Sequence, residues 1–191
     1  TEFMQAVENI KMLLPSGGVV DQNSVLELIS AFSATWISLD AYDKDKLVVS
    51  GTTKRAVAIT AEQLVQVLTD FKDVLIKKGE ATELYGSERQ AKVVQGMVGN
   101  VMQSFGGKPM YATVEEKAAH LLYFMVKNHP FTDGNKRSGA YAFVWFLKKA
   151  GILNLTTMTP STLTALTLLV AESDPKNKEK MIRLVLQLLR K

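Results

Sequence analysis

The chain has 191 residues, of which 47% are hydrophobic and 22% charged, and its formal net charge is +4. This composition indicates a globular protein with one main core rather than a disordered chain, and no apolar run reaches the roughly 20 residues that cross a bilayer. The absence of cysteine excludes a disulfide framework and any thiolate nucleophile or thiolate metal site, so we expect a cytoplasmic protein with no membrane partner.

The N-terminal part is predicted to form a helical extension with a short β-hairpin. Apolar residues recur at helical spacing over residues 25–36, and Pro15 to Gly18 break the pattern between two helical segments. Two short apolar runs, residues 47–49 and 56–59, flank a polar turn, which is the pattern of a hairpin.

A helix is predicted to begin at Thr60, where the N-terminal extension (residues 1–60) gives way to a second domain (residues 61–191). The Thr60 hydroxyl can accept a hydrogen bond from a first-turn amide while Gln63 reaches back to the backbone, the reciprocal pattern of a capping box. Gly79 is expected to follow the end of this helix.

Two further helices are predicted across the middle of the chain. The first covers about residues 88–104, and residues 105–111 then interrupt the helical pattern. The second begins after Thr113, which opens another capping-box signature. It ends near Asn128, because Pro130 cannot continue the hydrogen-bond ladder.

Three more helices complete the prediction. One runs from about Lys136 to Ala150 and stops at Gly151. Two others open at prolines, after Thr159 and after Asp174. The predicted fold class is therefore all-α, with a polar loop between two central helices.

That loop, residues 129–137, concentrates side chains with chemical roles. The imidazole of His129 can take a proton from an attacking hydroxyl. Gly134 lets an anion approach the backbone at the start of the next helix, where free amides and the helix dipole favour phosphate. Asp133 offers an oxygen ligand for Mg²⁺, and Arg137 offers a planar fork for phosphate oxygens.

The segment His-Pro-Phe-Thr-Asp-Gly-Asn-Lys-Arg, residues 129–137, resembles the active-site signature of Fic and death-on-curing (Doc) proteins of the Fido superfamily. The resemblance covers about residues 85–151 and includes residues 104–107, Tyr111 and residues 116–119. It implies a Fic-type helical core whose motif loop binds ATP together with Mg²⁺ or Mn²⁺.

The resemblance also implies a role for each residue of the loop. His129 would be the general base and Arg137 a catalytic phosphate clamp, Asp133 would hold the metal, and Phe131 would be an inward-packed structural anchor. The implied nucleotide-binding residues are Gly134, Asn135, Lys136 and Arg137. The other histidine, His120, is expected to be a hydrogen-bonded structural residue of the preceding helix.

The interruption before the second central helix has two interpretations. It is either a plain connection or a flap that docks an extended target segment by strand addition, which positions a side chain without reading its sequence. The residues of this candidate flap are Phe105, Gly106, Gly107, Met110 and Tyr111.

Two departures from the AMP-transferring pattern leave the reaction open. That pattern has glycine in place of Lys136 and a second arginine in place of Ala140. Lys136 is the Doc-like choice, and Doc proteins resemble kinases that bind the nucleotide in the reversed sense and transfer the γ-phosphoryl group. We rank AMP transfer to a Ser, Thr or Tyr hydroxyl first, Doc-like phosphoryl transfer second, and a degenerate Fic domain that only binds a partner third.

The resemblance implies a protein substrate and is compatible with an antitoxin-like inhibitor protein and with a homo-oligomer. Family members commonly block their own site with a glutamate that follows a Ser or Thr by four residues and presses on the second arginine. No glutamate here has that spacing, and Ala140 replaces the arginine. Nucleic acid is not expected as a partner, because the basic stretch at residues 176–191 has no interleaved aromatic residues.

Overall fold

The computed structural model describes residues 57, 59–79, 81–154, 156, 158 and 160–189. The helices predicted before residue 45 lie outside the described residues, as does nearly all of the hairpin predicted over residues 47–59. The described residues fall into two compact units, one within Thr52–Leu153 and the other within Asn154–Lys191.

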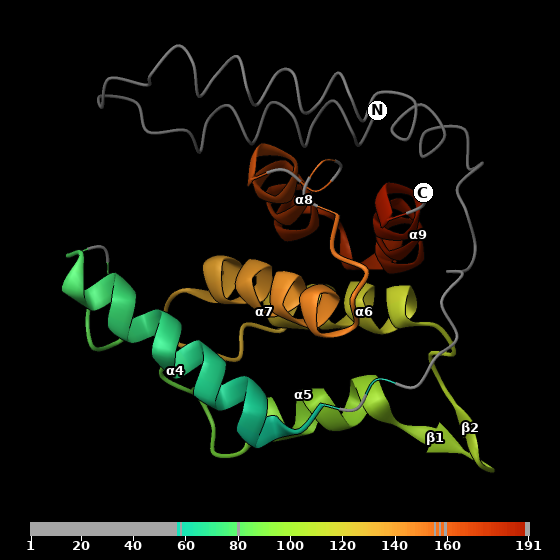
Figure 1. Ribbon diagram of the computed structural model, residues 1–191, viewed down its shortest axis with the longest axis horizontal. Coiled ribbons are helices and arrows are strands. Elements are labelled where there is room, and N and C mark those ends of the chain that lie inside the picture. The colour runs from blue at the N-terminus through green and yellow to red at the C-terminus, as the bar shows by residue number, and fades with distance from the viewer. Residues whose placement is uncertain are drawn as a thin grey trace. The chain divides into compact units, whose positions relative to one another are not determined.

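The described part of the chain is predominantly helical, which confirms the predicted all-α class. In the unit Thr52–Leu153 the helices are α4 (Ala61–Lys77), α5 (Val93–Met102), α6 (Val114–Lys127) and α7 (Asn135–Lys149) (Figure 1). The other unit contains α8 (Pro160–Glu172), the 3₁₀ turn η1 (Pro175–Asn177) and α9 (Lys178–Leu189). None of the described helices is both long enough and apolar enough to span a bilayer.

A short hairpin is present between α5 and α6. Strands β1 (Ser104–Phe105) and β2 (Lys108–Pro109) pair antiparallel, with Ser104 opposite Pro109 and Phe105 opposite Lys108. Gly106 and Gly107 both have positive φ, which is the backbone that so tight a turn requires. The interruption recognised in the sequence over residues 105–111 is therefore a hairpin rather than a plain loop.

Helix α4 begins and ends where the sequence predicts. The Thr60 side-chain oxygen accepts from the Gln63 amide at 3.2 Å, and the Thr60 amide donates to Gln63 Oε1 at 3.1 Å, which completes the capping box. After the helix, Gly79 adopts φ +72° and its amide donates to the Ile76 carbonyl at 2.9 Å. Local chemistry alone fixes both ends of this helix.

Helix α5 begins later than predicted, at Val93 rather than near residue 88. The preceding residues are not free to join it, because Tyr85 and Glu88 form β-bridges with the loop that follows α6. Lys92 turns the chain with φ +63°, and Glu88 Oε2 accepts from the Val93 amide at 3.2 Å. The start of α5 is thus set by a partner that is distant in the sequence.

Helix α6 and helix α7 lie side by side and form the centre of their unit (Figure 1). Gly139 allows a close approach of the two helices, because a Cβ atom there would lie 3.0 Å from Val126 Cγ2. Fully buried side chains, each worth roughly 1.5–3 kcal/mol relative to exposure, hold the pair together: Leu121, Leu122, Met125, Phe143, Phe146 and Leu147. Both ends of the connecting loop are therefore fixed to a rigid core.

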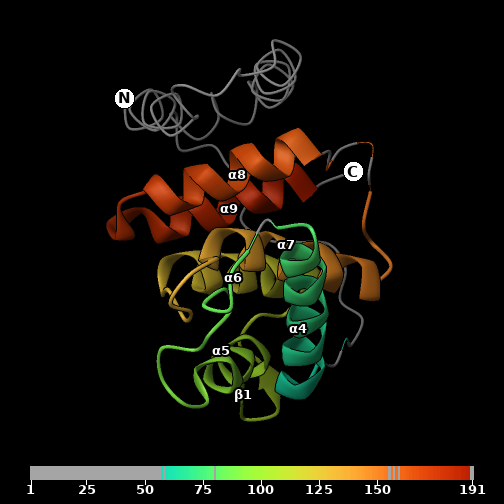
Figure 2. The ribbon, with the colours of Figure 1, turned by 90° about the vertical axis from the view of Figure 1, so that its left-hand side faces the viewer.

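Helix α4 reaches from α7 to α5, and it contacts both of them (Figure 2). Its buried residues, Leu64, Leu68 and Leu75, recur at helical spacing and face this interface. The segment that follows α4 returns along the loop between α6 and α7, and it carries the contacts that shape the candidate site.

Candidate functional site

The loop between α6 and α7 begins with an unusual backbone at His129. Helix α6 ends at Lys127, close to the end that the sequence predicts. Its C-cap residue is Asn128, whose amide donates the last helical hydrogen bond to the Phe124 carbonyl at 2.9 Å. His129 then adopts φ +48°, a left-handed conformation that few residues other than glycine adopt. The His129 side chain is exposed, whereas the next residue, Pro130, is buried. The imidazole is therefore accessible at the surface although the chain turns inward directly after it.

Asn135 holds the loop together from within. Its Oδ1 accepts from the Phe131 amide at 2.9 Å, and its Nδ2 donates to the Phe131 carbonyl at 3.0 Å. The Phe131 ring is only 3% exposed, so both the backbone and the side chain of this residue are fixed. These bonds fix the side chain of Asn135, whose backbone amide lies at the start of α7.

Residues 85–89, which we call the strap, bind the loop from outside. Backbone hydrogen bonds run from the Gly86 amide to the Asp133 carbonyl (3.0 Å), from the Thr132 amide to the Ser87 carbonyl (2.8 Å) and from the Arg89 amide to the Pro130 carbonyl (2.9 Å). These bonds, together with the Asn135 side chain, hold the loop in one conformation.

The start of α7 has features that favour a bound anion. Gly134 is the N-cap residue, adopts φ +82° and contributes no side-chain hydrogen bond, and the first turn contains no acidic residue. The amides of that turn and the positive end of the helix dipole therefore favour a bound anion. Lys136 and Arg137 lie in the same turn with exposed side chains and add positive charge.

Tyr85, in the strap, is a site residue that the sequence prediction missed. It is 1% exposed, and its ring packs so closely on Gly134 that a Cβ atom there would lie 2.2 Å from Cε2 of the ring. Its hydroxyl accepts from Ser138 Oγ at 3.2 Å, and Cζ of Arg137 lies 4.7 Å from the ring centroid. Burial raises the pKa of the Tyr85 phenol above its ordinary value. A single tyrosine outside any motif gives no signal in a sequence.

Asp133 is the residue with which the site could hold a metal. The described residues contain no cluster of three or more His, Cys, Asp or Glu side chains, so they offer no complete cage for an ion. The strap binds the backbone carbonyl of Asp133, and its carboxylate is exposed beside the anion site. One carboxylate suits Mg²⁺, which keeps most of its waters and takes further oxygens from phosphates. The residues therefore fit a metal that arrives with a nucleotide.

The hairpin carries exposed apolar side chains on an anchored base. Phe105 is 67% exposed and Met110 is 51% exposed. At the foot of the hairpin the Tyr111 ring stacks on His120 at a centroid distance of 3.6 Å, and Lys117 Nζ donates to the Tyr111 carbonyl. Nδ1 of His120 lies 2.7 Å from a carbonyl of its own helix, the structural hydrogen bond that the sequence predicts.

The structure does not bring the candidate flap to the motif loop. The hairpin precedes the first residue of α6, and the loop follows its last residue. The 14 residues of α6 span about 20 Å at a rise of about 1.5 Å per residue. A target segment that paired with the hairpin would have to cross the length of α6 to reach His129. The strap, and not the hairpin, is the extended segment beside the loop.

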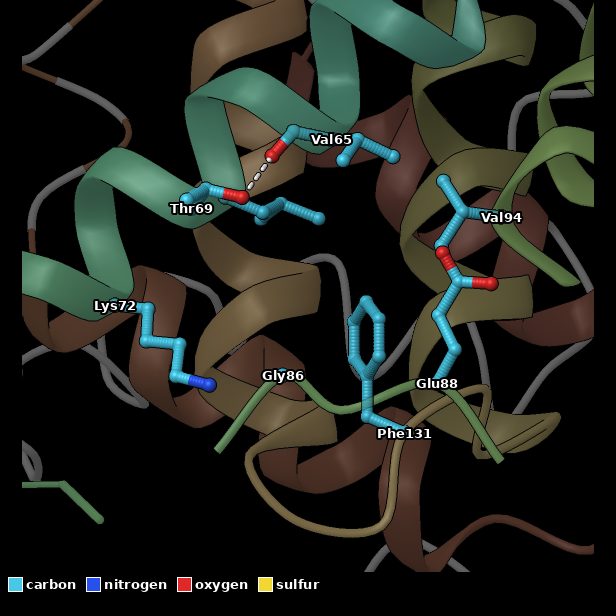
Figure 3. Close-up of a pocket in the computed structure, with 8 residues that line it drawn as sticks. Val65, Thr69, Lys72, Gly86, Glu88, Val94 and Phe131 are labelled. Atoms are coloured by element: carbon cyan, nitrogen blue, oxygen red, sulfur yellow. Dashed lines mark hydrogen bonds between the residues drawn. The ribbon is translucent and has the colours of Figure 1, made fainter. Parts of the chain in front are cut away.

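A small pocket lies between α4 and Phe131, and the side chain of Glu88 extends beside it toward Val94 of α5 (Figure 3). Its cavity volume is about 40 Å³, which has room for a water molecule but not for a nucleotide. The pocket is lined by Val65, Leu68, Thr69, Lys72, Gly86, Glu88, Val94 and Phe131. The start of α7 is therefore the better candidate for a nucleotide site.

Comparison with known proteins yields one match, to a family model. The model of the family described as Fic/DOC family matches residues 55–147, a segment that lies within the compact unit Thr52–Leu153 and includes the strap and the loop. No curated protein and no solved structure matches the chain significantly. Residues 55–147 are therefore a segment of the Fic/DOC family.

Proposed function

We propose that this protein uses ATP and a divalent cation to modify a protein hydroxyl, and that the group transferred is AMP. Fic/DOC family proteins are generally enzymes that modify other proteins. The observation that carries the proposal is the rigid loop, which joins the exposed imidazole of His129 to the uncapped, positively charged start of α7. A base and an anion site on one fixed element are what transfer from a nucleotide to a hydroxyl requires.

In the proposed reaction, the oxygen of a Ser, Thr or Tyr hydroxyl attacks the α-phosphorus of ATP. His129 takes the hydroxyl proton as the new O–P bond forms. The bond between the α-phosphorus and the bridging oxygen breaks, and pyrophosphate leaves with the electron pair. Arg137 and the amides of the first turn of α7 stabilise the negative charge on the phosphates.

Asp133 would hold Mg²⁺ or Mn²⁺ at the anion site, and the ion would neutralise charge on the phosphate oxygens. The bond between the Gly86 amide and the Asp133 carbonyl fixes the backbone at this position. The carboxylate is therefore presented from a fixed backbone.

Doc-like transfer of the γ-phosphoryl group is the second candidate. Lys136, exposed in the first turn of α7, places a bulky cation where the AMP-transferring pattern has glycine. Ala140 has no cation to bind the far end of a triphosphate, and losing a bidentate arginine removes a strong contact. Both features favour a nucleotide bound in the reversed sense. The hydroxyl would then attack the γ-phosphorus and ADP would leave, with His129 still the base.

A degenerate domain that only binds a partner is the third candidate. It is disfavoured because His129, Asp133 and Arg137, which have the direct chemical roles, are all present on the loop.

The test is incubation of the full chain with a cell lysate and ATP labelled at either the α- or the γ-phosphate. Label entering protein from the α-position supports AMP transfer, and label entering only from the γ-position supports the kinase. The matched controls are the His129→Ala variant and a reaction with chelator, which we expect to abolish incorporation. If neither label enters protein with Mg²⁺ or with Mn²⁺, the enzymatic proposal is wrong and the binding module replaces it.

A further inference from the structure

We propose that Tyr85 is a positioning residue that holds the guanidinium of Arg137 in place for phosphate binding. The proposal rests on the proposed function, because it gives Arg137 the task of binding a phosphate of the nucleotide. Tyr85 itself would touch neither the nucleotide nor the target hydroxyl.

The ring of Tyr85 provides a fixed surface beneath Arg137. The guanidinium carbon lies 4.7 Å from the ring centroid, within the range of a cation–π contact. An exposed arginine has many rotamers, and most of them would direct the guanidinium away from the anion site. A ring that binds the guanidinium face favours those rotamers in which the N–H groups at its edge stay available to a phosphate.

The ring can act as a template because contacts from three parts of the unit hold it. Gly134 packs against one edge, where any larger residue would collide with the ring. Ser138 Oγ donates to the hydroxyl at 3.2 Å. The ring of Phe71 in α4 meets the Tyr85 ring at an interplanar angle of 72° with 6.2 Å between centroids. The tyrosine is thus fixed by α4, by the loop and by the first turns of α7.

The backbone of Tyr85 links the same residue to the metal ligand. Tyr85 forms a parallel β-bridge with Asp133, and the amide of Gly86 donates to the Asp133 carbonyl at 3.0 Å. One residue therefore contacts the proposed metal ligand through its backbone and the proposed phosphate clamp through its ring.

The experiment replaces Tyr85 by phenylalanine and by a series of fluorinated phenylalanines in the full chain. These residues keep the shape of the ring, and added fluorine reduces the negative potential of its face. We expect the affinity for ATP with Mg²⁺ to be nearly unchanged in Tyr85→Phe. Affinity should then fall stepwise with fluorine content, by about 2- to 30-fold over the series. In the Arg137→Ala background the series should be flat.

Two controls separate positioning from packing. Trp145→Leu removes the ring beneath another cation of α7, Lys149, whose Nζ lies 5.4 Å from the Trp145 centroid, and it should leave ATP affinity unchanged. Ser138→Ala removes the same hydroxyl contact as Tyr85→Phe, so the two variants should bind ATP equally. An affinity that does not change with fluorine content, or that changes equally with and without Arg137, overturns the proposal.

A measurement without nucleotide keeps this inference separate from the proposed function. In NMR spectra of the free protein, the side-chain N–H signals of Arg137 should be shifted by the ring current of Tyr85, and the shift should vanish in Tyr85→Leu. Absence of the shift would overturn the positioning role whatever the activity. A shift without any ATP binding by the wild-type chain would support the contact and would instead overturn the proposed function.

Discussion

His129 leaves α6 in a left-handed backbone conformation that costs a residue other than glycine roughly 1–3 kcal/mol. The neighbouring residues sustain this conformation, because Asn128 closes the helix and the strap binds the carbonyl of Pro130. Strained residues of this kind are concentrated at functional sites. The left-handed backbone of His129 is therefore consistent with a catalytic role, which substitution of the residue can test.

We predict that His129→Ala abolishes transfer while the protein stays folded. The side chain is exposed, so its removal leaves no cavity, whereas loss of a general base typically lowers a rate by about 10²- to 10⁴-fold. The measurement is label transfer to a verified target, with circular dichroism as the control for folding. A variant that keeps the wild-type rate would show that another group is the base.

Asp133→Ala is predicted to weaken nucleotide binding only when Mg²⁺ is present. The strap binds the carbonyl of this residue and not its carboxylate, so the substitution should leave the loop intact. Titration calorimetry with ATP, with and without chelator, measures the effect. Equal affinity of the wild-type chain for ATP under both conditions would remove the metal role from Asp133.

At the scale of elements, the strap and the hairpin differ in their relation to the loop. Each contains a glycine with positive φ and open space where a Cβ atom would lie: Gly86 with φ +67° and Gly107 with φ +79°. An alanine at either position meets the same local strain of roughly 1 kcal/mol. Only Gly86 transmits that strain to the loop, through its bond to Asp133.

We therefore predict that Gly86→Ala weakens ATP binding by about 3- to 10-fold, in proportion to a local cost of about 1 kcal/mol. Gly107→Ala, the matched control, should change ATP affinity by less than about 2-fold, because α6 separates the hairpin from the loop by about 20 Å. Titration calorimetry on both variants decides between the strap and the hairpin. A larger loss in Gly107→Ala would mean that the hairpin acts on the nucleotide site after all.

The elements that could be predicted from the sequence are those whose ends depend on local chemistry. Thr60 and Gln63 cap α4 through neighbouring atoms, and Pro130 prevents α6 from continuing. The start of α5 could not be predicted, because the Glu88 backbone pairs with Phe131, a partner distant in the sequence. Hydrophobic periodicity contains no information about such a pairing.

At the scale of the whole molecule, the parts of the site also differ in whether they depend on neighbouring residues or on residues distant in the sequence. His129 to Arg137 are contiguous, so their chemistry could be read from one short segment. Tyr85, which packs against this segment, lies in the strap, where the sequence has no motif. Its role is recognised only in the folded structure, where it contacts α4 and α7. The boundary placed between residues 1–60 and 61–191 stays a prediction.

Control of the activity also belongs to this scale, because a free protein-modifying enzyme would act throughout a cell. Ala140 lies in α7 at the position of the arginine to which an inhibitory glutamate of the family would bind. An alanine side chain cannot form that charge-assisted hydrogen bond. Such bonds are worth about 1.5–3 kcal/mol each. Two glutamates already have structural partners: Glu88, in the strap, binds the Val93 amide, and Glu116, in the first turn of α6, binds the Ala112 amide.

We therefore predict that no glutamate of this chain inhibits it in cis, and that restraint comes from a separate antitoxin-like protein or from low expression. The test replaces Glu88, Glu115, Glu116 and Glu172 singly by glycine and measures self-modification and ATP affinity. Glu88→Gly and Glu116→Gly should lower stability, because each removes the acceptor of a backbone amide. None of the four should raise the activity. A gain of about tenfold or more in any variant would identify an inhibitory glutamate, because that factor corresponds to the loss of a single charge-assisted contact.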